Sequence, residues 1–329
     1  MPELGRYRFS FDTWKILEAD DLYLEESEEI GSLEVETRDW RPIDGTPADS
    51  IRIAFVDGVR RTENLVYLEG DDGTVSKGAF RVHRCRGALL LSLGRPNPAE
   101  DAYRNLKVRR FLFVEKGTDL GRRSLSFRFG DVSLDFFVEE TDGEISPHVN
   151  EVMAKLEAGV AEEVFKEEKP DLMITDGTLH YTAKIKNLPF VGYVKKHRKI
   201  YMYPENTCIL REMRVGQRTP LILIHSQPTM EGEGAKTFDK LTWYVKISES
   251  EGLSGIARLE VPAGIGVKRA VEIANLTAWL IPKFASAEFS DRRAPQNLVP
   301  VKYLENTLRH RIGSQTLIRK IIMDQMFKL

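Results

Sequence analysis

Two aspartates stand directly after short apolar runs at distant points of the chain. The run IRIAFV leads into Asp57, the run LMIT leads into Asp176, and a glycine follows each aspartate. Either pair alone is explained as a turn, because Asp-Gly is a favoured turn dipeptide. Ligands of open α/β sheets, however, bind outside the carboxyl ends of the strands. We therefore predict that each strand ends on its aspartate and that both carboxylates point into one crevice.

A third carboxylate, on a helix, would help to hold a divalent cation. Mg²⁺ and Mn²⁺ prefer hard oxygen ligands, and a two-metal phosphoryl-transfer site shares several carboxylates between ions about 3.5–4 Å apart. Residues 148–168 carry a helical stripe of apolar positions and end before Pro170. Glu157 flanks that stripe, whereas the other glutamates are explained as solvated surface charge. A carboxylate at the edge of a buried face must be paired, protonated or bound to metal, so Glu157 is the third candidate ligand.

Basic residues near these acids are candidate phosphate contacts for DNA. Two follow the first aspartate, two stand in the run VKKHRK, and two precede the segment APQN. They are Arg60, Arg61, Lys195, Lys196, Arg292 and Arg293. For any single arginine, a solvated charge or an ion pair is the better explanation. Nearby aromatics, Tyr193, Tyr201 and Tyr203, could stack on single-stranded bases or equally well pack on the core.

The elements that must position these residues change in kind along the chain. Strand-forming runs separated by turn signals fill the first third and predict an antiparallel, β-rich part. After Pro147, strands alternate with helices, which predicts an α/β core. The expected strands are 51–56, 64–70, 78–93, 109–116, 124–130, 132–140, 172–175, 190–196, 219–225, 241–247 and 256–261, and the expected helices are 10–29, 148–168, 267–283, 300–312 and 314–327.

Composition limits the class of protein. The 329 residues are 42% hydrophobic and 30% charged, with a formal net charge of −2, which is typical of a globular chain with a full core. The two cysteines have no paired spacing, which argues against a disulfide framework or zinc site and fits a cytoplasmic protein. No apolar stretch approaches a membrane span, so no membrane association is expected. We expect one domain, with a helical or extension segment at 1–45 and a core at 46–329 that carries a β-rich insertion at about 63–145.

Several motifs together resemble the NurA family of DNA-repair nucleases. They are VDGVRR at 56–61, LEAGVAEEV at 156–164, LMITDGTL at 172–179, VGYVKKHR at 191–198 and, most specifically, DRRAPQNLVPVKYLENTLRHRIG at 291–313. The similarity extends from about residue 50 to the C-terminus. It implies an α/β fold with an RNase H-like mixed sheet flanked by helices, a β-rich insertion in the first half and C-terminal helices.

The resemblance also implies an activity and partners. Members of the family are Mn²⁺-dependent 5′-to-3′ exonucleases and single-strand endonucleases. A deoxyribonuclease that uses Mn²⁺ or Mg²⁺, bound as two ions, is therefore expected. The family's members are homodimers that act with a hexameric HerA-like ATPase on single-stranded DNA and duplex ends, in end resection and double-strand break repair. The alternative is a catalytically silent scaffold of the same fold that binds DNA or the ATPase.

The family's three acidic positions coincide with the three acids found above. Its two strand-end aspartates fall on Asp57 and Asp176, and its helix glutamate falls on Glu157. Thr178 stands where the second aspartate motif usually has a serine. The resemblance thus assigns catalytic and metal-binding roles to all three acids.

The C-terminal motif departs from the family pattern. Asn297 stands where a tyrosine is expected, and Glu305 stands where a histidine is expected. Glu305 keeps a hard oxygen and is a candidate fourth catalytic and metal-binding carboxylate. Asp291 is the alternative fourth ligand, with anchoring of the adjacent loop an equally good explanation of it. Asn297 cannot act as an acid in place of a phenol, and we expect it to contact DNA.

Overall fold

The computed structural model describes residues 3–4, 7–11, 27–70, 73–94, 102–130, 132–141, 159–179, 188–195, 199–227, 238–249, 255–287 and 295–326. None of the helices in this part of the chain combines the length and the apolar composition of a membrane span.

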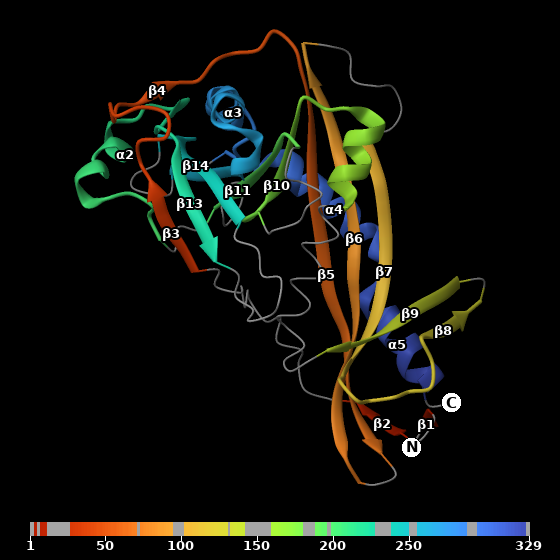
Figure 1. The fold of residues 1–329 in the computed structure, drawn as a ribbon. Helices are drawn as coiled ribbons and strands as arrows, with labels where there is room; N and C mark the ends of the chain where they lie inside the picture. The colour runs from red at the N-terminus through yellow and green to blue at the C-terminus, as the bar shows by residue number, and fades with distance from the viewer. Residues whose placement is uncertain are drawn as a thin grey trace.

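One mixed sheet runs through the molecule (Figure 1). Its order is β3 (Ser27–Ser32), β13 (Ile222–Gln227), β14 (Phe238–Lys246), β15 (Ile256–Pro262), β11 (Phe190–Val194), β10 (Leu172–Asp176), β5 (Ile51–Gly70), β6 (Val75–Leu93), β7 (Tyr103–Glu115), β9 (Val132–Thr141) and β8 (Ser124–Phe129). Shorter strands pair at its margins: β1 (Glu3–Leu4), β2 (Tyr7–Phe11), β4 (Ile43–Asp44) and β12 (Gln217–Arg218). The large mixed sheet and its helices confirm the predicted α/β class.

The helices cover both faces of the sheet. Among the described residues they are α2 (Ile209–Glu212), α3 (Val267–Leu280), α4 (Val299–Ile312), α5 (Gln315–Met326), the short 3₁₀ helices η1 (Pro204–Asn206), η3 (Ala263–Ile265) and η4 (Ile281–Lys283), and a helix at 159–168. Side chains alternate along a strand, so β5 sends Ile53 and Phe55 to the face covered by α3 and α4. It sends Ala54 and Val56 to the opposite face, where the 159–168 helix packs.

Strands β5, β6 and β7 extend beyond this core as a long arm (Figure 1). At the far end of the arm, β8, β9 and α5 enclose a second core that includes Leu68, Phe80, Phe136 and Ile322. Both chain termini lie at that end (Figure 1). The arm places α4 along β5, with α5 following it toward the second core.

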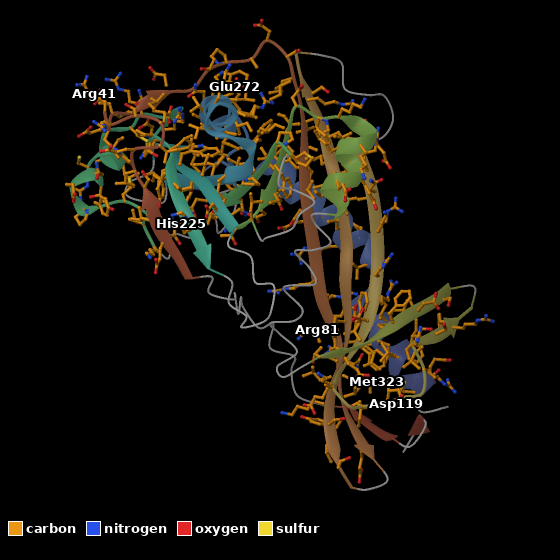
Figure 2. All side chains as sticks on the ribbon, viewed as in Figure 1. Arg41, Arg81, Asp119, His225, Glu272 and Met323 are labelled. Carbon is orange, nitrogen blue, oxygen red and sulfur yellow. The ribbon has the colours of Figure 1, made fainter. Side chains whose placement is uncertain are left out.

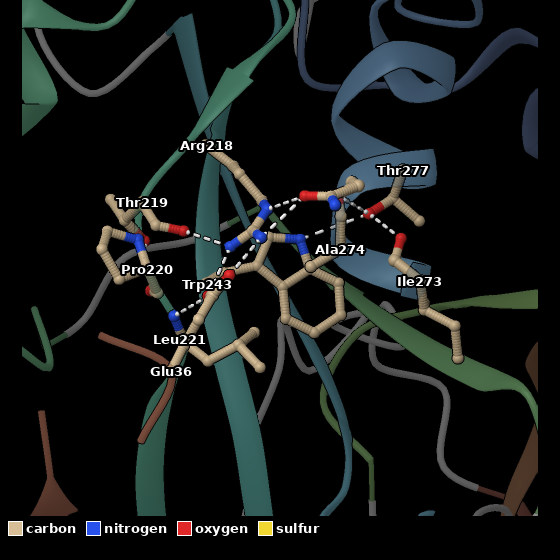
Figure 3. Close-up of polar contacts among 10 residues, drawn as sticks. Glu36, Arg218, Thr219, Pro220, Leu221, Trp243, Ile273, Ala274 and Thr277 are labelled. Atoms are coloured by element: carbon tan, nitrogen blue, oxygen red, sulfur yellow. Dashed lines mark hydrogen bonds and ion pairs between the residues drawn. The ribbon is translucent and has the colours of Figure 1, made fainter. Parts of the chain in front are cut away.

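A buried polar network fixes the segment that precedes β5. Arg218 is fully buried and donates to both carboxylate oxygens of Glu36, at 2.7 and 2.8 Å (Figure 3). The same guanidinium donates to Asn275 Oδ1 on α3, at 2.8 Å from Nε and 2.7 Å from Nη2. Leu221 N also donates to Glu36 Oε2, at 3.0 Å, so that oxygen accepts from both Leu221 and Arg218 Nη1. One arginine therefore ties three separate parts of the chain together.

Two predictions about local structure were wrong. Strand β5 does not end on Asp57, because β6 pairs with it along nearly its whole length, including Asp57 with Gly87 and Gly58 with Arg86. The hairpin ladder satisfies the backbone there, which outweighs the turn preference of Asp-Gly, and the expected strand at 64–70 is the continuation of β5. The helix expected at 10–29 is also wrong at both ends, where β2 and β3 form; residues 12–26 lie outside the described part.

The predicted antiparallel arrangement of the first third needs one correction. Strands β5, β6 and β7 are antiparallel neighbours, but β7 and β9 are parallel. Strand β9 lies between β7 and β8 in the sheet. It pairs with β8 as an antiparallel hairpin, and β8 forms the edge. The helices expected near 148–168, 267–283, 300–312 and 314–327 are confirmed where the structure describes them.

Candidate functional site

Asp57 and Asp176 lie at the same level on neighbouring parallel strands. The register of β5 with β10 ends at the pair Val56 and Thr175, so each aspartate comes one step later on its own strand. Neighbouring strands are about 4.8 Å apart, and residues at one level share a face. Asp57 is 8% exposed, and the Asp176 side chain is 23% exposed. The register thus brings two of the predicted carboxylates together at the carboxyl end of β10.

A lysine links Asp176 to the segment that precedes α4. Lys195 Nζ donates to Asp176 Oδ2 at 2.7 Å and to Asn297 Oδ1 at 2.8 Å. The lysine side chain is only 11% exposed. Lys195 lies two residues after Tyr193, the partner of Asp176 in the β10–β11 register, so alternation returns it to the same face. Lys195 therefore joins two other predicted residues, Asp176 and Asn297, through direct hydrogen bonds.

Tyr193 forms part of the floor of this site. It is fully buried, and its hydroxyl donates to the carbonyl oxygen of Gln296 at 2.8 Å. Burial, with the nearby charge of Asp176, raises the pKa of the Tyr193 hydroxyl well above its usual value. Core packing is thus the correct explanation for Tyr193 and for buried Tyr201, whereas Tyr203 is 49% exposed.

The remaining acids are placed differently. Glu305 on α4 has a side chain that is 34% exposed and lies 3.7 Å from Arg309 Nη2, one turn along the helix. Within the described residues, no group of three or more His, Cys, Asp or Glu side chains is close enough to hold a metal ion. In that part of the chain Asp57 and Asp176 are thus not joined by Glu305. Glu157 and Asp291 lie outside the described residues.

The helix at 159–168 runs alongside β5, and two ion pairs set its direction. Glu168 binds Arg104 at 2.6 Å, and Arg104 pairs with Ala88, the partner of Val56. Glu163 binds Lys107, which pairs with Arg86, the partner of Gly58. Residue 168 of the helix thus lies near the level of Val56 on β5, and residue 163 lies near the level of Gly58. The helix therefore runs antiparallel to this part of β5. Its amino end points toward the level of Asp57 along β5, but the helix packs on the Ala54 and Val56 face, whereas alternation places Asp57 on the opposite face, with Phe55 and Val59.

The predicted phosphate contacts have different surroundings. Arg61 forms an ion pair with buried Glu63, with Nη2 at 2.6 Å from Oε1, and donates to the carbonyl of Gly313 at 2.8 Å. Arg60 lies close enough to Arg81, on the arm (Figure 2), that its charge adds to burial in lowering the pKa of the Arg81 guanidinium. Lys196, Arg292 and Arg293 lie outside the described residues.

Comparison with known families identifies the chain's relatives. The NurA domain matches residues 104–307, well over half of the protein. The chain belongs to the NurA family. A search of curated proteins found no match. The NurA match includes Asp176, Lys195, Asn297 and Glu305, whereas Asp57 lies before it, so the assignment of Asp57 depends on its place beside Asp176 in the sheet.

The donors present at this NurA site fit a hard divalent cation. Asp57 and Asp176 offer carboxylate oxygens from adjacent strands, which is the ligand type that Mg²⁺ and Mn²⁺ prefer. The ammonium group of Lys195 already lies against Asp176 Oδ2, where it offsets part of the carboxylate charge and would repel a cation at that oxygen. The Lys195–Asn297 contact was not predictable from the sequence, because it joins residues 102 positions apart.

Proposed function

We propose that this NurA-family protein is a divalent-metal-dependent deoxyribonuclease. It would act as a 5′-to-3′ exonuclease and a single-strand endonuclease. The observation that carries the proposal is the placement of Asp57 and Asp176 at one level of the β5–β10 pair. Glu157, together with Glu305 or Asp291, would supply further ligands for two Mn²⁺ or Mg²⁺ ions. The proposal of Glu157 rests on the family pattern, because the described part of its helix packs on the face of the sheet opposite to Asp57.

The side chains of the site have separate tasks in this proposal. The bound cations would supply Lewis-acid charge for activating water and neutralising the leaving oxygen. Asp57 and Asp176 hold those cations, and Lys195 holds Asp176 Oδ2 while offering positive charge to the scissile phosphate. Asn297 orients Lys195 through its Oδ1 atom. Tyr193 is not a base, because its hydroxyl donates to Gln296 and its raised pKa keeps the proton on the ring oxygen.

The phosphate backbone would be held by basic residues around these acids. Arg60, Lys196, Arg292 and Arg293 are proposed contacts that position the strand without reading its sequence. Arg61 is a weaker candidate, because two of its nitrogens are bound to Glu63 and a third to Gly313.

We also propose the assembly in which the nuclease acts. Family membership supports a homodimer that works with a hexameric HerA-like ATPase. Its substrates would be single-stranded DNA and duplex ends, and its process would be end resection in double-strand break repair. Co-purification with such an ATPase and sedimentation of the isolated protein test these two statements.

A cleavage assay tests the activity itself. With Mn²⁺, the purified protein should shorten linear DNA from its 5′ end and nick single-stranded circles. Asp57→Ala and Asp176→Ala should abolish both reactions, while Asp119→Ala, an acid on the arm (Figure 2), should not. DNA binding without any cleavage by the wild-type protein would support the silent scaffold instead.

A further inference from the structure

The three residues after Asp176 are held at two points. Gly177, at φ +102°, donates its backbone N–H to the carbonyl of Tyr193 at 2.8 Å. Leu179 donates its backbone N–H to Glu260 Oε1 at 2.6 Å. The first contact uses the neighbouring strand β11, whereas the second uses a side chain from β15, one strand further away. A buried carboxylate therefore fixes the turn that carries a proposed metal ligand.

Glu260 reaches this turn because the strand between them has no side chain at the crossing point. Gly192 on β11 pairs with Thr175 on one side and with Glu260 on the other. A Cβ atom at Gly192 would lie 3.0 Å from Glu260 Cγ and 2.9 Å from the carbonyl oxygen of Gly177. Any larger residue would force the turn and the glutamate apart. Glycine at this position thus allows the contact between Glu260 and the turn.

Two buried cations compensate for the charge of Glu260. The glutamate is fully buried, and Lys240 Nζ, also fully buried, lies 3.3 Å from its Oε1 atom. Arg258 Nη2 lies 3.2 Å from its Oε2 atom, and the Arg258 guanidinium lies over the Tyr201 ring at 4.7 Å. An isolated carboxylate would be very unfavourable here. With both cations present, it is a strong, charge-assisted acceptor for the N–H group of Leu179.

We propose that Glu260 is a positioning residue for Asp176. It acts through the backbone of the 177–179 turn, and it does not touch the reacting atoms. The role rests on the proposed function, in which Asp176 binds the catalytic cation. Groups that orient metal ligands typically change metal affinity by about 10–100-fold when they are removed.

A matched pair of double variants separates this role from simple charge balance. Both carry Lys240→Met, and one adds Glu260→Met while the other adds Glu260→Gln. Each double variant removes one positive and one negative charge, but only glutamine keeps a side-chain oxygen that can accept the hydrogen bond from Leu179 N. We expect the Met/Met variant to bind Mn²⁺ about 10–100-fold more weakly than wild type, and the Gln variant to bind close to wild type. Mn²⁺ titration of each folded, metal-free protein gives the affinity, and its thermal midpoint without metal shows whether the fold is retained.

The outcomes are distinguishable from failure of the proposed function. If wild-type protein binds no Mn²⁺, or if Asp176→Ala binds it unchanged, the metal site itself is wrong and the role of Glu260 falls with it. If wild type binds Mn²⁺ and the folded Met/Met variant binds it equally well, the positioning role alone is overturned. Should that variant not fold, Gly192→Ala, which keeps every charged group, takes its place. It is expected to weaken Mn²⁺ binding, and unchanged affinity would overturn the proposal.

Discussion

Replacing Lys195 by methionine should separate catalysis from stability. The substitution removes two hydrogen bonds, at 2.7 Å to Asp176 and 2.8 Å to Asn297. A hydrogen bond to a charged group contributes about 1.5–3 kcal/mol when it is shielded from water. Because the Asp176 side chain is 23% exposed, water can replace the lost donor. We therefore expect the free energy of unfolding to fall by only about 1 kcal/mol.

The effect of the same change on cleavage should be far larger. Loss of a preorganised positive group at a developing charge typically lowers the rate by about 10²–10³-fold. Mn²⁺ affinity should not weaken, because Lys195 and the metal ion compete for the carboxylate of Asp176 and their positive charges repel each other. Single-turnover cleavage of linear DNA, Mn²⁺ titration and urea unfolding measure the three quantities. Lys302→Met, an exposed lysine on α4, is the control. Full cleavage by Lys195→Met, or weaker Mn²⁺ binding with normal cleavage, would refute the reasoning.

Three further results are expected. Arg218→Met should lower the free energy of unfolding by about 3–5 kcal/mol, because it leaves the largely buried carboxylate of Glu36 without its partner. Arg309→Ala removes an exposed pair with Glu305 and should change the free energy of unfolding by no more than about 0.5 kcal/mol. Chemical denaturation measures both values. Burial raises the pKa of Glu63 despite the adjacent arginine, so its contribution to stability is present at acid pH and is lost as the pH rises from the ordinary value of 4.5 through the raised one. In urea unfolding over a pH series, the stability of wild type relative to Glu63→Gln should decrease as pH rises, and a constant difference would contradict the assignment. Mn²⁺ at about 100 times its Kd should stabilise the wild type by about 2.7 kcal/mol, and neither EDTA-treated protein nor Asp57→Ala should show that gain in a thermal scan.

The sequence predicted the core strands well because their composition leaves few alternatives. Strands β10 and β15 are buried on both faces, and such strands are rich in apolar residues, as LMIT is in β10. The length of β5 was not predictable in the same way. Its Asp-Gly pair has a local preference for a turn, and only the pairing with β6, a tertiary feature, carries the strand through it.

In the candidate site, too, some features follow from local sequence and others depend on tertiary structure. The placement of Asp57 beside Asp176 follows from two strands that share a pattern and lie next to each other, so the sequence could anticipate it. The contact of Lys195 with Asn297 depends on how the segment before α4 returns to the sheet, and no local pattern encodes that path. The sequence marks Glu260 only as an acid two residues after Arg258 in a strand that is otherwise apolar, and the backbone N–H group that it binds lies 81 residues away.

The central claim is that Asp57 and Asp176 hold a divalent cation together. Anomalous scattering from a crystal soaked in Mn²⁺ tests it most directly. We expect a manganese peak between the two carboxylates, with Glu157 among its neighbours and either Glu305 or Asp291 as a further ligand. A saturated crystal whose manganese peaks all lie away from Asp57 and Asp176 would contradict it.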